Sequence, residues 1–166
     1  MGVLENQTCP FCFKKTLSLT EEEKDISGFG IVYLLSMGCS SCNFSKTDVE
    51  LFESSKKKLT FDVESKKDFD IVIIKSSSAK IKIPTIRKSI KPSENSSGCI
   101  TDVKGLIEEF ENILISERDS CEDKKEKKSI KNTLKKLWKV KLGEIPLKII
   151  IEDPSGNSVI VSDKVK

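Results

Sequence analysis

The chain has 166 residues, of which 37% are hydrophobic and 33% are charged, as in an ordinary soluble protein. This length allows one domain or two small ones. The formal charge of +3 is too small to indicate nucleic-acid binding by itself. The longest apolar stretch, Ile31 to Leu35, is far too short to span a bilayer. No basic segment followed by an apolar run opens the sequence, so we expect neither a membrane segment nor a signal peptide.

Four of the six cysteines form two C-x-x-C pairs, Cys9–Cys12 and Cys39–Cys42, with 26 residues between the pairs. Each pair fits a tight turn that presents two sulfurs to one ion, and Zn²⁺ accepts four such ligands in a tetrahedron. The chain contains no histidine, so these cysteines are the one plausible set of soft ligands. We predict that Cys9, Cys12, Cys39 and Cys42 bind one structural Zn²⁺; the alternatives are two disulfides or a redox C-x-x-C.

The segments around the cysteines indicate a zinc ribbon over residues 1–55. Lys14 to Thr20 alternates polar and apolar residues and predicts a strand. The acidic, then glycine-rich Glu21 to Gly30 predicts a loop, and Ile31 to Ser36 predicts the returning strand. Such a unit has almost no core, so metal binding should supply on the order of 10 kcal/mol of its folding free energy.

Residues 56–166 begin with short β-segments. Leu59, Phe61 and Val63 alternate along Lys58 to Ser65 and should share a buried face. Further strands are expected at Phe69 to Ile74, at Ala79 to Ile83, and around Ile86 and Ile90 after the break at Pro84. Pro92 to Gly98 has the composition of a loop.

The hydrophobic period changes after Thr101, which is expected to cap a helix. Apolar residues follow at helical spacing: Val103, Leu106, Ile107, Phe110, Ile113 and Leu114. Ser116 to Asp123 breaks this pattern. A second helix should then bury one face and end near Gly143; the face consists of Ile130, Leu134, Leu137 and Trp138.

The two helices should form an antiparallel hairpin inserted at about residues 101–143 of the β-domain. After it, Leu147 to Ile151, the turn Asp153 to Asn157 and Val159 to Val161 predict a β-hairpin. The expected fold class is therefore mostly β with an inserted α-helical hairpin (α+β).

The second helix is crowded with lysines, most of them opposite its apolar face: Lys124, Lys125, Lys127, Lys128, Lys131, Lys135, Lys136, Lys139 and Lys141. This face suits a solvated surface, contact with RNA phosphates, or an acidic protein partner. The helix has no interleaved aromatic platform for bases, and its apolar side, including Trp138, is expected to belong to the core.

Catalysis and small-molecule substrates are not expected. Four sulfurs would close the zinc site, and Cys99 and Cys121 have no histidine to activate them. Unpaired Cys99 and Cys121, together with the C-x-x-C pairs, indicate a reducing compartment, so we expect a cytoplasmic location.

Several segments resemble the ZPR zinc-finger family. They are the two cysteine pairs, Leu59 to Val63, Lys75-Ser76, Ala79 to Pro84, Thr101 to Ile107 and Glu152-Asp153-Pro154-Ser155-Gly156-Asn157-Ser158. With one ribbon and one β-domain, the chain is similar to the single-module form found in archaea. The resemblance implies a four-cysteine zinc ribbon followed by a double-stranded β-helix-like domain with a helical hairpin.

For eukaryotic members, the resemblance also implies binding to translation elongation factor 1-alpha and assistance with its folding. The expected function is therefore that of a zinc-binding protein-interaction module. The alternative is an RNA- or transcription-associated zinc ribbon that uses the lysine-rich helix.

Overall fold

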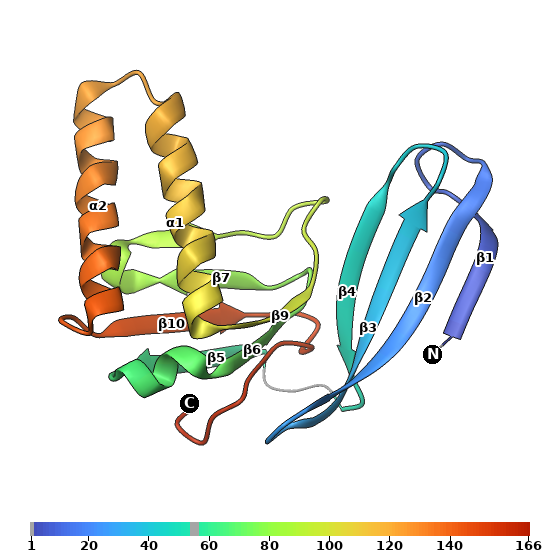
Figure 1. Ribbon diagram of the computed structural model, residues 1–166, viewed down its shortest axis with the longest axis horizontal. Helices are drawn as coiled ribbons and strands as arrows, with labels where there is room; N and C mark the ends of the chain where they lie inside the picture. Colours follow the sequence, from blue (N-terminus) through green and yellow to red (C-terminus); the bar gives the residue numbers. More distant parts are fainter. Residues whose placement is uncertain (1, 54–56) are drawn as a thin grey trace.

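The computed structural model describes residues 2–53 and 57–166. A four-stranded ribbon and a β-domain with a helical hairpin lie side by side (Figure 1). The mostly β fold with an inserted hairpin is thereby confirmed. The predicted boundary between residues 55 and 56 lies outside the described residues.

The ribbon is one antiparallel sheet in the order β1-β2-β3-β4. Its strands are β1 (Gly2–Thr8), β2 (Lys15–Ile26), β3 (Gly30–Cys39) and β4 (Ser45–Leu51). The predicted loop at residues 21–30 is wrong, because β2 and β3 remain paired from Glu21↔Leu35 to Ile26↔Gly30. The pairing places the charged side chains of β2 opposite β-prone residues of β3, and this tertiary context outweighs the weak strand propensity of glutamate. The turn is confined to residues 27–29, where Gly28 has a φ of 79°.

The β-domain consists of two facing sheets. One has the order β5-β10-β7-β8 and the other the order β11-β6-β9. Their strands are β5 (Lys58–Val63), β6 (Val72–Lys75), β7 (Lys80–Ile83), β8 (Lys88–Ile90), β9 (Cys99–Asp102), β10 (Leu147–Glu152) and β11 (Val159–Ile160). As predicted, Leu59, Phe61 and Val63 are buried, and they join side chains of both sheets in one core.

The predicted β-hairpin at the C-terminal end is wrong. Strand β10 pairs with β5 and β7, whereas β11 pairs with β6 in the other sheet. The turn at residues 153–157 therefore carries the chain from one sheet to the other. A local turn signal fixes a change of direction but not the partner of the next strand.

Two predicted strands begin later than expected because short 3-10 turns precede them. The turn η1 (Lys66–Asp70) forms where the Asp68 carboxylate accepts hydrogen bonds from the backbone N–H groups of Glu64 and Ser65, at 2.9 and 3.0 Å. The turn η2 (Pro84–Ile86) takes Ile86 out of the strand expected there.

The helical hairpin follows β9. Helix α1 (Val103–Ser120) is capped by Asp102, whose carboxylate accepts a hydrogen bond from the Gly105 N–H at 2.6 Å. The capping residue lies one position after the predicted Thr101. The helix runs through most of the predicted break. Helix α2 (Lys124–Leu142) ends as predicted at Gly143, which has a φ of 79°.

The inner face of the hairpin packs on the β-core through α1 and three residues of α2, Ile130, Leu137 and Val140. Burial of Trp138 was predicted and is wrong, since this side chain is 59% exposed. One residue turns an α-helix by about 100°. With Leu137 pointing into the core, the next side chain is therefore directed to the flank of the helix.

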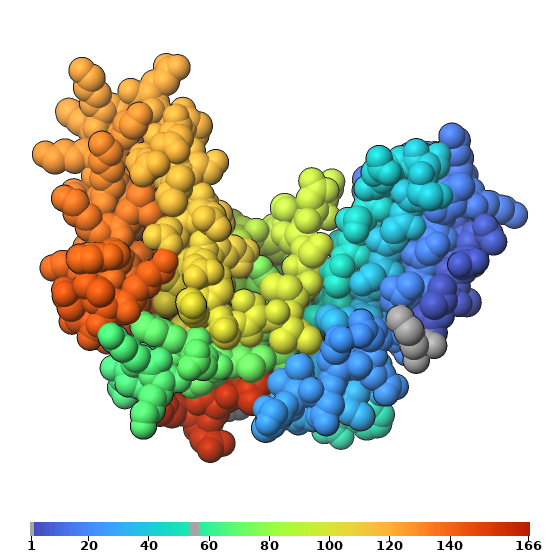
Figure 2. All heavy atoms as spheres, in the orientation of Figure 1, coloured from blue at the N-terminus to red at the C-terminus, as the bar shows by residue number. Residues whose placement is uncertain are grey.

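The ribbon is fastened to the β-domain by apolar and polar contacts. Val32 and Val49 of the ribbon pack with Ile74 and Val159. The Asp48 carboxylate accepts from the Ser77 backbone N–H at 2.8 Å, and other hydrogen bonds cross the same junction. In the space-filling view, the ribbon and the hairpin rise as two arms above this junction (Figure 2).

A buried carboxylate fixes the turn that joins the two sheets. Asp153 is 1% exposed and accepts hydrogen bonds from four serine hydroxyls, at 2.6 to 2.9 Å. These serines are Ser76, Ser78, Ser155 and Ser158. Burial by itself would raise the pKa of Asp153, but the hydroxyl donors outweigh it and lower the pKa to about 2.

We predict that Asp153→Asn removes part of the acid sensitivity of the fold. A lowered pKa stabilises the folded state above the unfolded value near 3.8, and this contribution is lost as the pH falls toward 2. The difference corresponds to about 2 kcal/mol. Urea unfolding followed by helical circular dichroism should show a variant that is less stable by about this amount at pH 6 and nearly equal to wild type at pH 2. Exposed Asp163→Asn is the control; an unchanged gap between wild type and Asp153→Asn at both pH values would contradict the assignment.

Candidate metal centre

The four predicted ligands meet at one end of the ribbon. Cys9 and Cys12 lie in the turn between β1 and β2, Cys39 is the last residue of β3, and Cys42 lies in the turn between β3 and β4. Because the strands are antiparallel, with Leu17 opposite Cys39, both turns come to the same end of the sheet. All four Sγ atoms lie within 4.8 Å of one another.

The sulfur geometry fits a tetrahedral zinc ion. Cys9 Sγ lies 3.7 Å from Cys42 Sγ, and Cys12 Sγ lies 3.7 Å from Cys39 Sγ. Zn–S bonds of about 2.3 Å at tetrahedral angles place neighbouring sulfurs about 3.8 Å apart. A disulfide would need about 2.05 Å, and the cysteines are free thiols in the structure. The donor set therefore supports a structural Zn²⁺, which these four cysteines would hold.

The two knuckles have the same backbone geometry. In the first, the Cys9 N–H donates to the Lys14 carbonyl at 2.9 Å, and the Phe13 N–H donates to the Cys9 carbonyl at 3.0 Å. In the second, the corresponding bonds join Cys39 to Phe44 at 2.8 Å and Asn43 to Cys39 at 3.0 Å. Each knuckle thus closes on itself with two backbone hydrogen bonds, which directs both of its sulfurs to one point.

A hydroxyl supports one of the sulfurs. Thr16 Oγ1 lies 3.2 Å from Cys39 Sγ, and this hydrogen bond is the main reason why the pKa of the Cys39 thiol is lowered to about 6. A hydrogen bond to a sulfur favours the thiolate, which is the form that binds metal.

Little apolar packing lies beneath the sulfurs. The buried cluster at this end consists of Cys9, Leu17 and Cys39, with a few half-buried neighbours. A cluster of this size cannot fix two turns against chain entropy, so the metal would supply the missing stabilisation. Four sulfur ligands would also fill the tetrahedron and leave no position for a reactive water.

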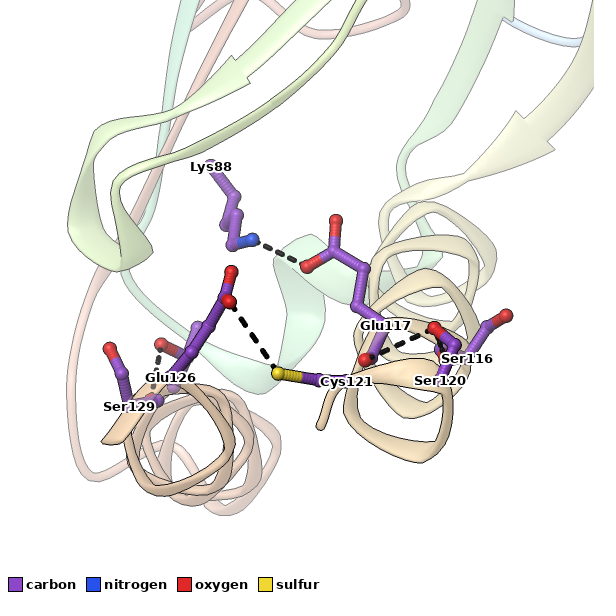
Figure 3. A network of polar contacts seen from close by, with 8 residues as sticks. Lys88, Ser116, Glu117, Ser120, Cys121, Glu126 and Ser129 are labelled. Atoms are coloured by element: carbon purple, nitrogen blue, oxygen red, sulfur yellow. Dashed lines mark hydrogen bonds and ion pairs between the residues drawn. The ribbon is translucent and has the colours of Figure 1, made fainter. Parts of the chain in front are cut away.

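The other two cysteines lie away from the zinc centre. Burial raises the pKa of the Cys99 thiol. Burial also raises the pKa of Cys121, with a further contribution from its hydrogen bond to the Glu126 carboxylate at 3.5 Å (Figure 3). Thiols with raised pKa values stay protonated at neutral pH and are poor nucleophiles.

Exposed aromatic side chains next to the knuckle cysteines were not singled out from the sequence. Phe11 is 61% exposed and Phe13 is 78% exposed. Phe11 lies against Phe44, with ring centroids 4.4 Å apart. The sequence signal was available, because the run Cys-Pro-Phe-Cys-Phe places two aromatic residues in a turn that has no core to bury them.

None of the described helices is both long and apolar enough to cross a membrane.

A four-cysteine ribbon joined to a two-sheet β-domain with a helical hairpin defines a zinc-finger protein with an appended jelly roll. The family model of the ZPR1 jelly-roll domain matches residues 67–166. A ZPR1-like protein of Methanocaldococcus jannaschii is 33% identical over all of this chain and 85% of its own length. A second ZPR1-like protein, from Pyrococcus horikoshii, is 30% identical over 95% of this chain and 73% of its own length.

A zinc finger chaperone of Schizosaccharomyces pombe is 28% identical over 80% of this chain, and the match covers 29% of that longer protein. The chain belongs to the ZPR1 zinc-finger family. It corresponds to about a third of the eukaryotic members it matches.

We predict that Thr16→Val weakens zinc binding by about tenfold, because it removes the hydroxyl that supports Cys39 and keeps the shape of the side chain. Competition with a chromogenic chelator measures the change. Thr16→Ser keeps the hydroxyl and should bind zinc like wild type, whereas Cys39→Ser should lose the metal. Stoichiometric zinc of wild-type affinity in Thr16→Val or in Cys39→Ser would contradict the site.

Proposed function

We propose that this protein is a zinc-stabilised protein-interaction module that binds translation elongation factor 1-alpha and assists its folding. It acts in the cytoplasm and catalyses no reaction. The observation that carries the proposal is the pair of exposed phenylalanines, Phe11 and Phe13, in the first zinc knuckle at the end of the ribbon.

The backbone conformation and the exposure of Phe13 are both unfavourable for the stability of the fold. Its φ of 60° lies in the left-handed region, which bulky side chains avoid, and its ring is 78% exposed. The equivalent position of the second knuckle is Asn43, with a φ of 57°, and asparagine is a usual residue for this conformation. A strained backbone and an exposed ring bring no benefit to the isolated fold, so they favour a role in contact with another molecule.

The ribbon offers more apolar surface along its sheet. An open hollow of about 570 Å³ is lined by residues of all four strands, among them Leu19, Leu35 and Met37. Val3 and Leu4 at its rim are 53% and 61% exposed. Exposed aromatic and aliphatic groups of this kind are typical anchors of protein–protein contacts.

The choice of partner comes from the family. The Schizosaccharomyces pombe relative is named a zinc finger chaperone. A chaperone needs an apolar surface that stays rigid while the conformation of its client protein changes. Zinc-closed knuckles supply such a surface without a large core.

We predict that Phe13→Asn lowers the affinity for purified elongation factor 1-alpha of the same organism by about 30-fold, equivalent to about 2 kcal/mol. Asparagine fits the left-handed backbone, so the knuckle should keep its zinc and its fold. Isothermal titration calorimetry measures the affinity, and metal analysis verifies the zinc content.

The matched control is Phe29→Asn. Phe29 is 40% exposed and lies in the turn between β2 and β3, at the opposite end of the ribbon from the knuckles. The Phe29→Asn variant should bind elongation factor 1-alpha with wild-type affinity. Equal affinity of both variants and wild type, or no binding by the zinc-loaded wild type, would contradict the proposed function.

A further inference from the structure

The outer face of α2 carries a concentrated positive charge. The helix contains nine lysines, and Glu126 is its one acidic residue. Among the described residues, Lys141 is the one α2 lysine in an ion pair, with Glu111 of α1. The remaining lysines therefore present charge to solvent over a helix of about 28 Å, the length of 19 residues at 1.5 Å each.

An aromatic ring stands within this charged face. Trp138 is 59% exposed, and Leu142, one turn further on, is 41% exposed. Residues three, four and seven apart lie on the same side of a helix, so Lys131 and Lys135 share the side of Trp138. From the sequence, no aromatic platform was expected on this helix and Trp138 was expected in the core; the exposed indole supplies one aromatic ring.

The shape of this face favours a polyanion over a folded protein partner. Three hollows of about 550, 400 and 570 Å³ are lined by strands, by loops and, in one of them, by Glu109 of α1; none of their lining residues belongs to α2. The side chains of α2 instead project from the outer flank of the molecule (Figure 2). Protein hot spots are desolvated in pockets, whereas phosphates and unstacked bases are bound by projecting cations and exposed rings.

We propose that the outer face of α2 binds single-stranded nucleic acid, with lysines neutralising phosphates and the Trp138 indole stacking on one base. This activity is separate from the contact proposed for the zinc knuckles, which lie in the other arm of the molecule (Figure 1). Binding is independent of base sequence, because neither group reads base edges.

Trp138 is the one tryptophan of the chain, so its fluorescence reports directly on stacking of the indole. The zinc-loaded protein is titrated with an oligouridylate of about 12 nucleotides at about 50 mM salt, and in parallel with oligothymidylate to distinguish RNA from DNA. Saturable quenching of the Trp138 fluorescence is expected. The logarithm of the binding constant should fall linearly with the logarithm of the salt concentration, with a slope of about −0.7 for each phosphate contacted. Binding of either oligonucleotide satisfies the proposal, and its absence with both overturns it.

Variants separate stacking from charge, with affinity read from the anisotropy of a labelled oligouridylate. Trp138→Ala should lower the affinity by about 5- to 100-fold, and Trp138→Phe should restore most of it. Lys131→Gln/Lys135→Gln should reduce both affinity and salt slope. The matched control, Lys57→Gln/Lys91→Gln, removes the same charge from exposed lysines outside α2 and should leave both unchanged.

Helical circular dichroism verifies that each variant is folded. Two results would overturn the proposal: equal losses in the α2 and control double variants, or full affinity in Trp138→Ala. Poly-glutamate that quenches Trp138 as strongly as oligouridylate of the same charge would also overturn it, and would assign this face to an acidic protein segment.

Discussion

The convergence of four sulfurs at one end of the ribbon is the constraint on which the rest of the structure depends. Beneath them lie few buried apolar residues, so packing alone cannot hold the two knuckles together. One ion with four thiolate ligands would fix both turns, align β1 to β4, and hold Phe11 and Phe13 in water at defined positions. The exposed rings would thus follow from the metal geometry, and the backbone strain at Phe13 persists because Cys12 directly precedes it and two backbone hydrogen bonds close the knuckle.

The second constraint is the junction between the ribbon and the jelly roll. Asp48 binds Ser77 across it, and the backbone of Gly98 comes so close to β4 that a Cβ atom would lie 2.9 Å from the Val49 nitrogen. Close packing of this kind prevents free rotation of the ribbon. The zinc end and the lysine-rich helix therefore keep a fixed separation in two arms of one body (Figure 2). A partner at the knuckles and a nucleic acid on α2 could be bound together without a conformational change.

The sequence was most informative where chemistry restricts the choice of residues. Cysteine spacing in a chain without histidine identified the four residues that the structure brings together, and the periods of apolar residues located most strands and both helices. The predictions were wrong where contacts between distant segments determine the secondary structure or the strand pairing. Glu21 to Asp25 belongs to a strand because β3 lies beside it, and β11 leaves β10 because the Asp153 carboxylate binds serines of a distant loop. Trp138 was misplaced because one face of a helix is wider than the part its neighbour covers. The backbone strain at Phe13 could not be predicted, because it is a property of φ that composition does not reveal, although the run Cys-Pro-Phe-Cys-Phe did signal an exposed ring.

Hydrogen exchange of the zinc-loaded protein before and after chelation tests the central claim most directly, because it follows the ribbon and the jelly roll separately in one chain. If zinc holds the knuckles, chelation should remove the protection of backbone amides in β1 to β4, first at the cysteine end, while the amides of β5, β10 and α1 stay protected. Unchanged protection of the ribbon after complete removal of the metal would contradict the account, because it would show that packing alone maintains the knuckles.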